Sequence, residues 1–178
     1  MCGIAGYIDF NKISTRDNLV SMTDVLSHRG PDGADYEQFQ YKTAIIGLGH
    51  RRLSIIDLSE NAKQPMHYKH FTLCFNGEIY NFEEIKAQLT ELGHSFKMES
   101  DSEMILHAYE EWGEKCMDKF IGMFVFSILD EKKHQFFCVR DRTGVKPFFY
   151  YFKDGLFLFS SELKSFHEHP NFSKEINT

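Results

Sequence analysis

Short apolar segments of strand length dominate this sequence, and their distribution limits the folds that the chain can form. They are rich in β-branched or aromatic residues and predict strands at 2–8, 43–48, 71–75, 122–129, 134–139, 148–152 and 156–159. Helical spacing of apolar residues predicts a helix that begins at Thr15 and stops at Gly30-Pro31, and further helices over 81–93 and 100–113; a short last helix begins at 161. The strands are thus grouped toward both ends of the chain, around a pair of helices. Since this order is not the regular alternation of a doubly wound fold, we expect an α+β protein of antiparallel sheets covered by helices.

The composition indicates one folded domain that does not bind nucleic acid. The 178 residues include 18 Phe and 8 Tyr, which is enough apolar surface for a substantial core. The formal net charge is −6 and no block of Lys or Arg occurs, which disfavours a nucleic-acid partner. No apolar segment approaches the roughly 20 residues of a membrane helix, and the sequence has no signal-peptide pattern. We therefore expect a cytoplasmic protein with no membrane contact.

Cysteine and histidine residues are scattered rather than clustered along the chain. The four cysteines lack CxxC spacing, which argues against a disulfide scaffold or a zinc site and is typical of a reducing compartment. The closest histidine pair is His167 and His169, and the segment around it offers no cysteine or HExxH partner. We interpret both as surface residues and expect no metal site.

Cys2, directly after Met1, is a candidate nucleophile. If Met1 is removed, Cys2 carries a thiol and a free α-amine on the same residue. An α-amine is partly unprotonated near neutral pH, so it can take the proton as the thiol attacks. The alternative is that a cysteine at position 2 is a coincidence of the start site.

Polar residues at the ends of predicted elements are further candidates, and each has an ordinary structural alternative. The charged loop 28–33 contains Gly and Pro and would also suit the end of a helix. Arg52, between two apolar strands, can form a forked contact with a carboxylate, or it is a solvated residue at a strand end. Asn76-Gly77 follows a predicted strand and is more often a hairpin turn than a site. Asp101 begins a helix, where the helix dipole alone favours a carboxylate.

Taken together, these pieces resemble the glutaminase domain of glutamine-dependent asparagine synthetases, which are class II glutamine amidotransferases and N-terminal-nucleophile hydrolases. The resemblance covers nearly the whole chain, from Cys2 to about Phe166. Its motifs are MCGIAG at 1–6, HRGPDG at 28–33, GHRRLSIIDLS at 49–59, QPM at 64–66, FNGEIYN at 75–81, SDSE at 100–103, GMFVF at 122–126, RDRTGVKP at 140–147 and SSELKS at 160–165. The implied fold is a four-layer αββα sandwich of two antiparallel sheets flanked by helices.

The resemblance also implies a reaction, the hydrolysis of L-glutamine to glutamate and ammonia. In this family Cys2 would attack the carboxamide carbon and form a γ-glutamyl thioester, with its own α-amine as the base. The side-chain amide of Asn76 and the backbone N–H of Gly77 would stabilise the negative oxygen. The substrate itself would be held by a set of residues that surround its charged end and its length: Arg52, Leu53, Ser54, Ile55, Ile56, Asn76, Gly77, Glu78 and Asp101.

In the family this domain precedes an ATP-dependent synthetase domain, and nothing like a phosphate-binding loop occurs here. We therefore expect a glutamine amidotransferase type 2 domain over 1–170 and the start of a linker to an absent synthetase domain over 171–178. No cofactor is expected in this domain, whereas ATP and Mg²⁺ would be used by the absent one. The expected partners are L-glutamine and the C-terminal synthetase domain, which the loop 140–147 and the aromatic strands would face; a homodimer is left open.

Two other functions remain open at this level. One is an amidotransferase domain that supplies ammonia to a different acceptor, such as a sugar or a peptide carboxylate. The other is a glutamine-binding module without catalytic activity.

Overall fold

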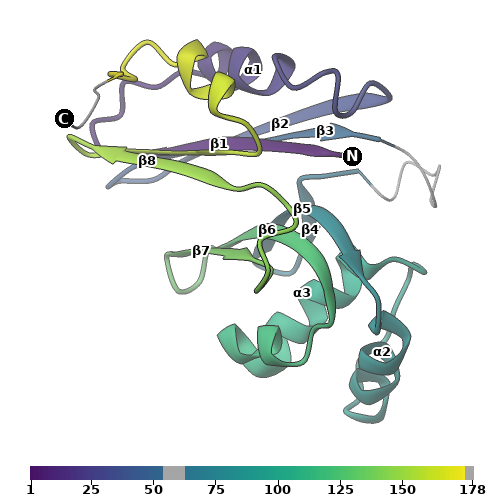
Figure 1. Cartoon of the computed structure of the whole chain (residues 1–178). Coiled ribbons are helices and arrows are strands. Elements are labelled where there is room, and N and C mark those ends of the chain that lie inside the picture. The colour runs from purple at the N-terminus through teal and green to yellow at the C-terminus, as the bar shows by residue number, and fades with distance from the viewer. Residues whose placement is uncertain (54–62, 175–178) are drawn as a thin grey trace. The chain divides into compact units, whose positions relative to one another are not determined.

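The strands of the computed structural model form two antiparallel sheets, each with helices on one face (Figure 1). The structure describes residues 1–53 and 63–174. These residues divide into unit 1 (1–53 and 148–174) and unit 2 (63–147), and each is described by itself. The prediction of an α+β fold built from antiparallel sheets is confirmed.

The sheet of unit 1 has the strand order β2-β3-β1-β9-β8. Its strands are β1 (Gly3–Asp9), β2 (Gly33–Gln40), β3 (Ile45–Arg52), β8 (Phe149–Lys153) and β9 (Leu156–Ser160). The first strand of the chain is therefore the middle strand, paired with β3 on one side and β9 on the other. This position holds the N-terminal end of the chain firmly in the sheet.

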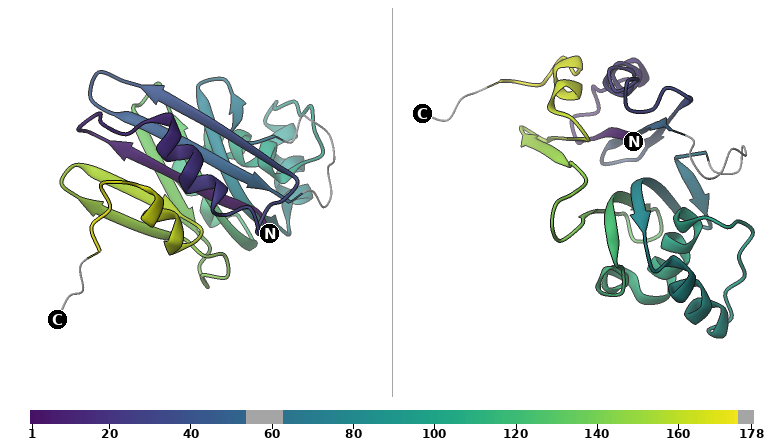
Figure 2. Two further views of the ribbon diagram at one scale, coloured as in Figure 1. Left: turned by 90° about the horizontal axis from the view of Figure 1, so that it is seen from above. Right: turned by 45° about the vertical axis from the view of Figure 1, so that its right-hand side comes forward.

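One face of this sheet is covered by α1 (Arg16–Asp24) and by the 3₁₀ segment η3 (Leu163–Glu168), which lie side by side in Figure 2. The start of α1 is fixed by Thr15, whose side chain accepts a hydrogen bond from the backbone N–H of Asn18 in a capping box. Leu19 and Met22, one turn apart, are fully buried against the sheet together with Phe166. The helical spacing of the sequence thus identified the buried face of α1 correctly.

The sheet of unit 2 has the order β4-β5-β6-β7. Its strands are β4 (Met66–Tyr68), β5 (Phe71–Ile79), β6 (Gly122–Asp130) and β7 (Gln135–Arg140). The helices α2 (Phe82–Glu91) and α3 (Asp101–Trp112) cover one face, and the 3₁₀ segment η2 (Gly113–Asp118) follows α3 (Figure 1). Ile85, Leu89 and Ile105 from the helices form one buried cluster with Leu73 and Phe126 from the strands. None of the described helices is long and apolar enough to cross a membrane.

One local prediction was wrong in a way that matters for the site. Asn76-Gly77 does not form a turn; both residues lie within β5 and pair with Val125 and Phe124 of β6. A Cβ on Gly77 would overlap the carbonyl oxygen of Met123 and lie 2.6 Å from Phe124 Cα. Glycine is therefore required here by the close approach of the neighbouring strand, not by turn geometry.

Three further differences concern the periphery. The strand β2 was not predicted, because its sequence GADYEQFQ has no apolar segment and every residue in it is partly or fully exposed. Asn81 precedes α2 without a side-chain capping bond; its amide instead donates to Lys119 O (3.0 Å) and accepts from Ile121 N (2.9 Å). His169, expected on the surface, is buried and lies 3.0 Å from Ser14 Oγ, whereas His167 is exposed as predicted.

Candidate active site

The thiol of Cys2 lies just before the start of β1 and contacts the backbone of Leu53. The N–H of Leu53 points to Sγ at 3.4 Å, and Sγ lies 3.7 Å from the carbonyl oxygen of the same residue. Cys2 is partly exposed. The contact fixes the thiol at an accessible end of the sheet, where a substrate can reach it.

Arg52 belongs to the same end of the sheet because of the strand register. In the antiparallel pair β1–β3, Gly3 lies opposite Arg51. The next step of this register places Cys2 opposite Arg52, the last residue of β3. Unit 1 thus brings together three of the predicted residues, Cys2, Arg52 and Leu53.

Arg29, from the HRGPDG motif, anchors the segment that carries Cys2. Its Nε donates to Cys2 O (3.0 Å) and its Nη1 contacts Glu162 Oε1 (3.1 Å), with its side chain 9% exposed. The same motif packs tightly on β3, since a Cβ on Gly30 would lie 2.6 Å from Arg52 N. Arg29 and Glu162 lie in the HRGPDG and SSELKS motifs, but neither was predicted as a site residue, because a buried arginine that bonds a backbone carbonyl has no signal in sequence spacing.

In unit 2, Asn76 and Gly77 lie in the middle of β5. Asn76 is 3% exposed, and its Nδ2 is buried without a hydrogen-bond partner among the described residues. A buried amide without a partner costs stability and is a recognised sign of a functional role. Asn76 Nδ2 is thus a buried donor without an acceptor in the described part of the chain.

The backbone N–H of Gly77 points to the edge of β5 that faces away from β6. Phe75 N and Ile79 N, two residues to either side, bond to Gln64 Oε1 (2.5 Å) and Asp101 Oδ2 (3.3 Å) on that edge. Alternate residues of a strand direct their N–H groups the same way, so Gly77 N–H lies between these two. Because β4 pairs only with 71–73, no described strand covers this N–H.

Asp101 is the first residue of α3, beyond the end of β5. Ser100 caps the helix by accepting from Glu103 N (3.4 Å). Burial raises the pKa of Asp101 to about 6; the nearby charge of Glu78 adds to this, while the N–H groups of Ile79 and Ser102 oppose it. A carboxylate that is destabilised in this way gains from a cationic ligand.

Gln64, from the QPM motif, is a second residue whose role the sequence did not reveal. It is 7% exposed, accepts from Phe75 N, and its Nε2 lies 3.5 Å from Ser102 Oγ. It therefore links β5 next to Asn76 with the first turn of α3. The predicted residues Ser54, Ile55 and Ile56 lie outside the described residues.

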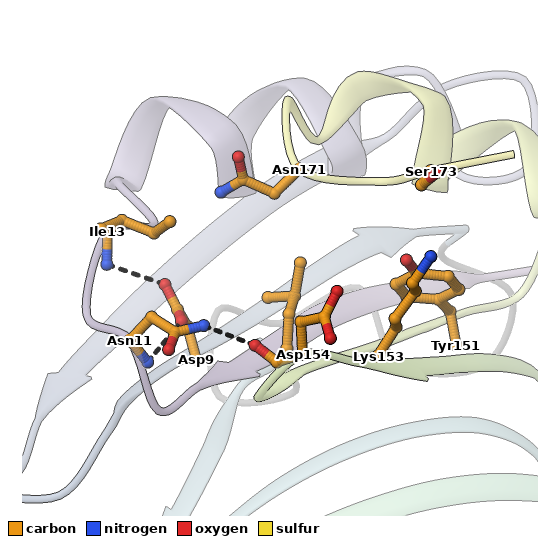
Figure 3. Close-up of a pocket in the computed structure, with 9 residues that line it drawn as sticks. Asp9, Asn11, Ile13, Tyr151, Lys153, Asp154, Asn171 and Ser173 are labelled. Atoms are coloured by element: carbon orange, nitrogen blue, oxygen red, sulfur yellow. Dashed lines mark hydrogen bonds between the residues drawn. The ribbon is translucent and has the colours of Figure 1, made fainter.

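A cavity of about 380 Å³ in unit 1 is distinct from these residues (Figure 3). It lies at the other end of β1 from Cys2, about 23 Å away for seven residues of strand. The carboxylate of Asp9 beside it is engaged by Asn11 N, Ile13 N and the backbone and hydroxyl of Ser14, at 2.7–2.8 Å. Burial would raise the pKa of Asp9, but these hydrogen bonds lower it below its usual value. Asp9 therefore organises the loop after β1 and is not available for chemistry.

A family model described as a glutamine amidotransferase domain matches residues 1–178. The chain belongs to this family. The match spans the described parts of both units, so the residues around Cys2 and those around Asn76 belong to one glutamine amidotransferase domain.

Relatives of this domain support the resemblance to asparagine synthetases. The chain is 41% identical to "Asparagine synthetase [glutamine-hydrolyzing] 3" of Bacillus subtilis, over 99% of this chain and 29% of that protein. It is 42% identical to "Putative asparagine synthetase [glutamine-hydrolyzing] 2" of Methanocaldococcus jannaschii, over 92% of this chain and 34% of that protein. The domain thus spans about a third of the length of these relatives.

Solved structures of lower sequence identity share the fold. A glutamine phosphoribosylpyrophosphate amidotransferase from B. subtilis aligns over 93% of this chain and 43% of its own, with a TM-score of 0.71 at 19% identity. A structure described as the allosteric regulatory enzyme of purine biosynthesis aligns over 94% of this chain and 43% of its own, with a TM-score of 0.78 at 18% identity. The fold of this domain is therefore that of the glutamine amidotransferases. Phe172 still packs on Tyr151 and Phe166, and the domain boundary near residue 170 stays a prediction.

Proposed function

We propose that this domain hydrolyses L-glutamine to glutamate and ammonia, and that the ammonia serves an ATP-dependent asparagine synthetase domain of the parent protein. The observation that carries the proposal is the Cys2 thiol, held by the Leu53 backbone at the N-terminal end of a central strand in a glutamine amidotransferase domain. The proposal includes removal of Met1, so that Cys2 has a free α-amine.

The chemistry then proceeds in two stages. Cys2 Sγ attacks the carboxamide carbon while its proton passes to the α-amine, and the carbonyl oxygen becomes negative. Asn76 Nδ2 and Gly77 N–H donate to this oxygen. The protonated amine returns the proton to the leaving nitrogen, ammonia departs, and a γ-glutamyl thioester remains. Water attacks the thioester, again with the amine as base, and releases glutamate and the thiol.

The charged end of glutamine supplies the selectivity. Arg52 would bind the α-carboxylate through its forked guanidinium, and Asp101 with Glu78 would bind the α-ammonium. The raised pKa of Asp101 supports this role, because an ammonium group offsets the cost of the buried carboxylate. An amide without either charge leaves buried polar groups unpaired and should be rejected.

The synthetase domain is the proposed partner, and ATP and Mg²⁺ would bind there. Its contact is supported by exposed aromatic residues of β8, because Tyr150 and Phe152 are 70% and 64% exposed on the sheet face opposite to Tyr151, which packs in the core. Val145, in the loop that Asp141 organises through its backbone contacts, is 57% exposed. Large exposed apolar side chains of this kind often mark an interface.

Ammonia release tests the proposal directly. Purified protein whose N-terminus has been established by mass determination is assayed with glutamine, beside Cys2→Ala and, as a matched control, Cys138→Ala. We expect turnover in the wild type and in Cys138→Ala, and none in Cys2→Ala. Glutamine binding without hydrolysis by folded, Met1-free protein, or equal rates with and without Cys2, contradicts the proposal.

A further inference from the structure

Two histidines and a glutamate converge in unit 2, between α3 and the segment that follows α2. His107 and Glu110 lie one helical turn apart on α3, and His94 comes from the segment that follows α2. One potential ligand atom from each of the three lies within 4.8 Å of the others. This cluster is separate from every residue to which the proposed function assigns a role.

The two imidazole rings approach each other through their Nδ1 atoms. His94 Nδ1 and His107 Nδ1 are 2.9 Å apart, and both rings point their other nitrogen toward a carboxylate. His94 Nε2 lies 3.0 Å from Glu111 Oε2, and His107 Nε2 lies 3.9 Å from Glu103 Oε1. A neutral imidazole has one N–H donor and one lone pair, so an Nε2–H directed at a carboxylate leaves the lone pair on Nδ1.

Two neutral rings cannot each donate to their own carboxylate and also bond to each other. If His107 carries its proton on Nδ1, it can donate to His94, but its buried Nε2 then presents a lone pair toward the carboxylate of Glu103. If both rings carry the proton on Nε2, two Nδ1 lone pairs meet at 2.9 Å. His107 is 1% exposed, and its Nε2 has no hydrogen-bond partner among the described residues. A positive charge between the two Nδ1 atoms, either an added proton on His94 or a metal ion, removes this conflict. A metal ion would also leave the carboxylates of Glu111 and Glu103 behind the two imidazoles, at 3.0 and 3.9 Å from their Nε2 atoms.

Glu110 supplies the third ligand. Its Oε1 pairs with Lys69, whereas its Oε2 is buried and has no hydrogen-bond partner within the described parts of the chain. Tetrahedral ligands at about 2.0–2.1 Å from a metal are about 3.4 Å apart. The two Nδ1 atoms, now 2.9 Å apart, would separate slightly on binding, and the Glu110 carboxylate would move to complete the set. A cleft of about 440 Å³ lined by His94, Glu110 and Glu111 leaves room for a water molecule as the fourth ligand.

The surroundings fix the ligands before any metal binds. The rings of Tyr68 and Phe96 flank His107, with centroids at 4.2 and 4.5 Å. Glu103 accepts from Lys97 N and Met98 N at 2.7–3.1 Å, which ties the segment carrying His94 to α3. Because these contacts already restrain the ligand side chains, metal binding costs little conformational entropy.

We propose that His94, His107 and Glu110 bind one divalent transition-metal ion of the zinc type, with a water molecule as fourth ligand. Two imidazoles and one carboxylate suit Zn²⁺, whereas Mg²⁺ and Ca²⁺ prefer oxygen ligands only. The ion joins the segment after α2 to α3, so it stabilises unit 2 by binding the folded state. This site was not predicted from the sequence, because His94, His107 and Glu110 are spaced 13 and 3 positions apart and match no familiar metal-binding motif.

Calorimetry with Zn²⁺ tests the site in untagged full chain carrying Cys2→Ala, which removes the accessible thiol as a competing ligand. We expect one Zn²⁺ per chain, a higher melting temperature with Zn²⁺, and the visible absorption of tetrahedral Co²⁺ when Co²⁺ replaces it. His94→Gln and Glu110→Gln should each weaken binding by at least about tenfold. The matched control His167→Gln, an exposed histidine in unit 1, should bind as before, and Mg²⁺ should give no heat.

Lys69 provides an independent variant, because its ammonium competes with the metal for Glu110. Its φ of 54° suits asparagine, so Lys69→Asn should fold and bind Zn²⁺ more tightly. The absence of saturable binding with a Kd below about 100 µM overturns the proposal. Binding that is unchanged in folded His94→Gln protein, as judged by circular dichroism and urea unfolding, overturns it equally.

Discussion

Replacing Asn76 with leucine should raise the free energy of unfolding and lower kcat. Leucine has nearly the same branched shape as asparagine but no polar atoms. Asn76 is 3% exposed, and its Nδ2 has no hydrogen-bond partner among the described residues, so the wild type carries the cost of a buried, unsatisfied donor. The substitution removes that cost.

The two magnitudes follow from general values. An unsatisfied buried polar group costs about 1–3 kcal/mol, so Asn76→Leu should raise the free energy of unfolding by about 1–2 kcal/mol once imperfect packing is deducted. Loss of one donor to the negative oxygen costs about 2.7–4 kcal/mol of barrier, so kcat for glutamine hydrolysis should fall by about 10²–10³. KM should change little, because the donor acts mainly in the transition state.

Urea unfolding and steady-state ammonia release measure the two effects on the same samples. Asn81→Leu is the matched control in the same unit, because both atoms of its amide are bonded, to Lys119 O and Ile121 N. It should lose about 1–3 kcal/mol of unfolding free energy through the two broken hydrogen bonds and keep its kcat. A loss of stability in Asn76→Leu similar to that of the control would refute the reasoning, as would a fall in kcat of less than about tenfold.

Three further predictions concern Gly77, Asp101 and Arg29. Gly77→Ala should lower the unfolding free energy by about 1–3 kcal/mol in urea titrations, because its Cβ would overlap the backbone of β6; an unchanged midpoint contradicts that packing. Burial raises the pKa of Asp101 to about 6, compared with 3.8 in the unfolded chain. The protonated carboxyl therefore contributes fully to the free energy of unfolding below pH 3.8, and this contribution is lost as the pH rises through about 6. Asp101→Asn should therefore be about 2–3 kcal/mol more stable than the wild type at pH 7 and no more stable at pH 3.5, and a pH-independent difference argues against it. Arg29→Met, which removes the hydrogen bond to Cys2 O, should lower kcat at least about tenfold with little change in glutamine affinity; a rise in KM alone would make Arg29 a substrate ligand instead.

Much of the fold was predictable because burial follows apolar periodicity. The residues Leu19 and Met22 of α1 and Ile85 and Leu89 of α2 are all buried, as their helical spacing indicated. β2 was missed because a strand whose residues are all partly or fully exposed has no apolar alternation to detect. Asn76-Gly77 was misplaced because local turn preference was outweighed by pairing with β6, which only the three-dimensional structure reveals.

The candidate site was predicted by resemblance rather than by spacing. Motifs nominate Cys2, Arg52 and Asn76 as site residues, which stays a prediction, and the structure adds what surrounds them. Arg29 donates to the backbone carbonyl of Cys2, and Gln64 accepts from the backbone N–H of Phe75. Contacts of this kind join residues from separate parts of the chain and leave no pattern in a single sequence. The cluster of His94 and His107 is hidden for the same reason, since a loop and a helix must fold together before the two rings meet.

The central position of β1 has a practical consequence for anyone who handles this protein. With β3 on one side and β9 on the other, the first strand has no free edge along which an added peptide could run. Any residues fused before Cys2 must leave the sheet beside the Arg29 carbonyl, which Met1 N already contacts at 3.2 Å. An N-terminal affinity tag should therefore leave folding intact while it converts the α-amine of Cys2, the proposed base, into an amide, so a tagged sample that folds well would be a poor guide to glutamine-hydrolysing activity.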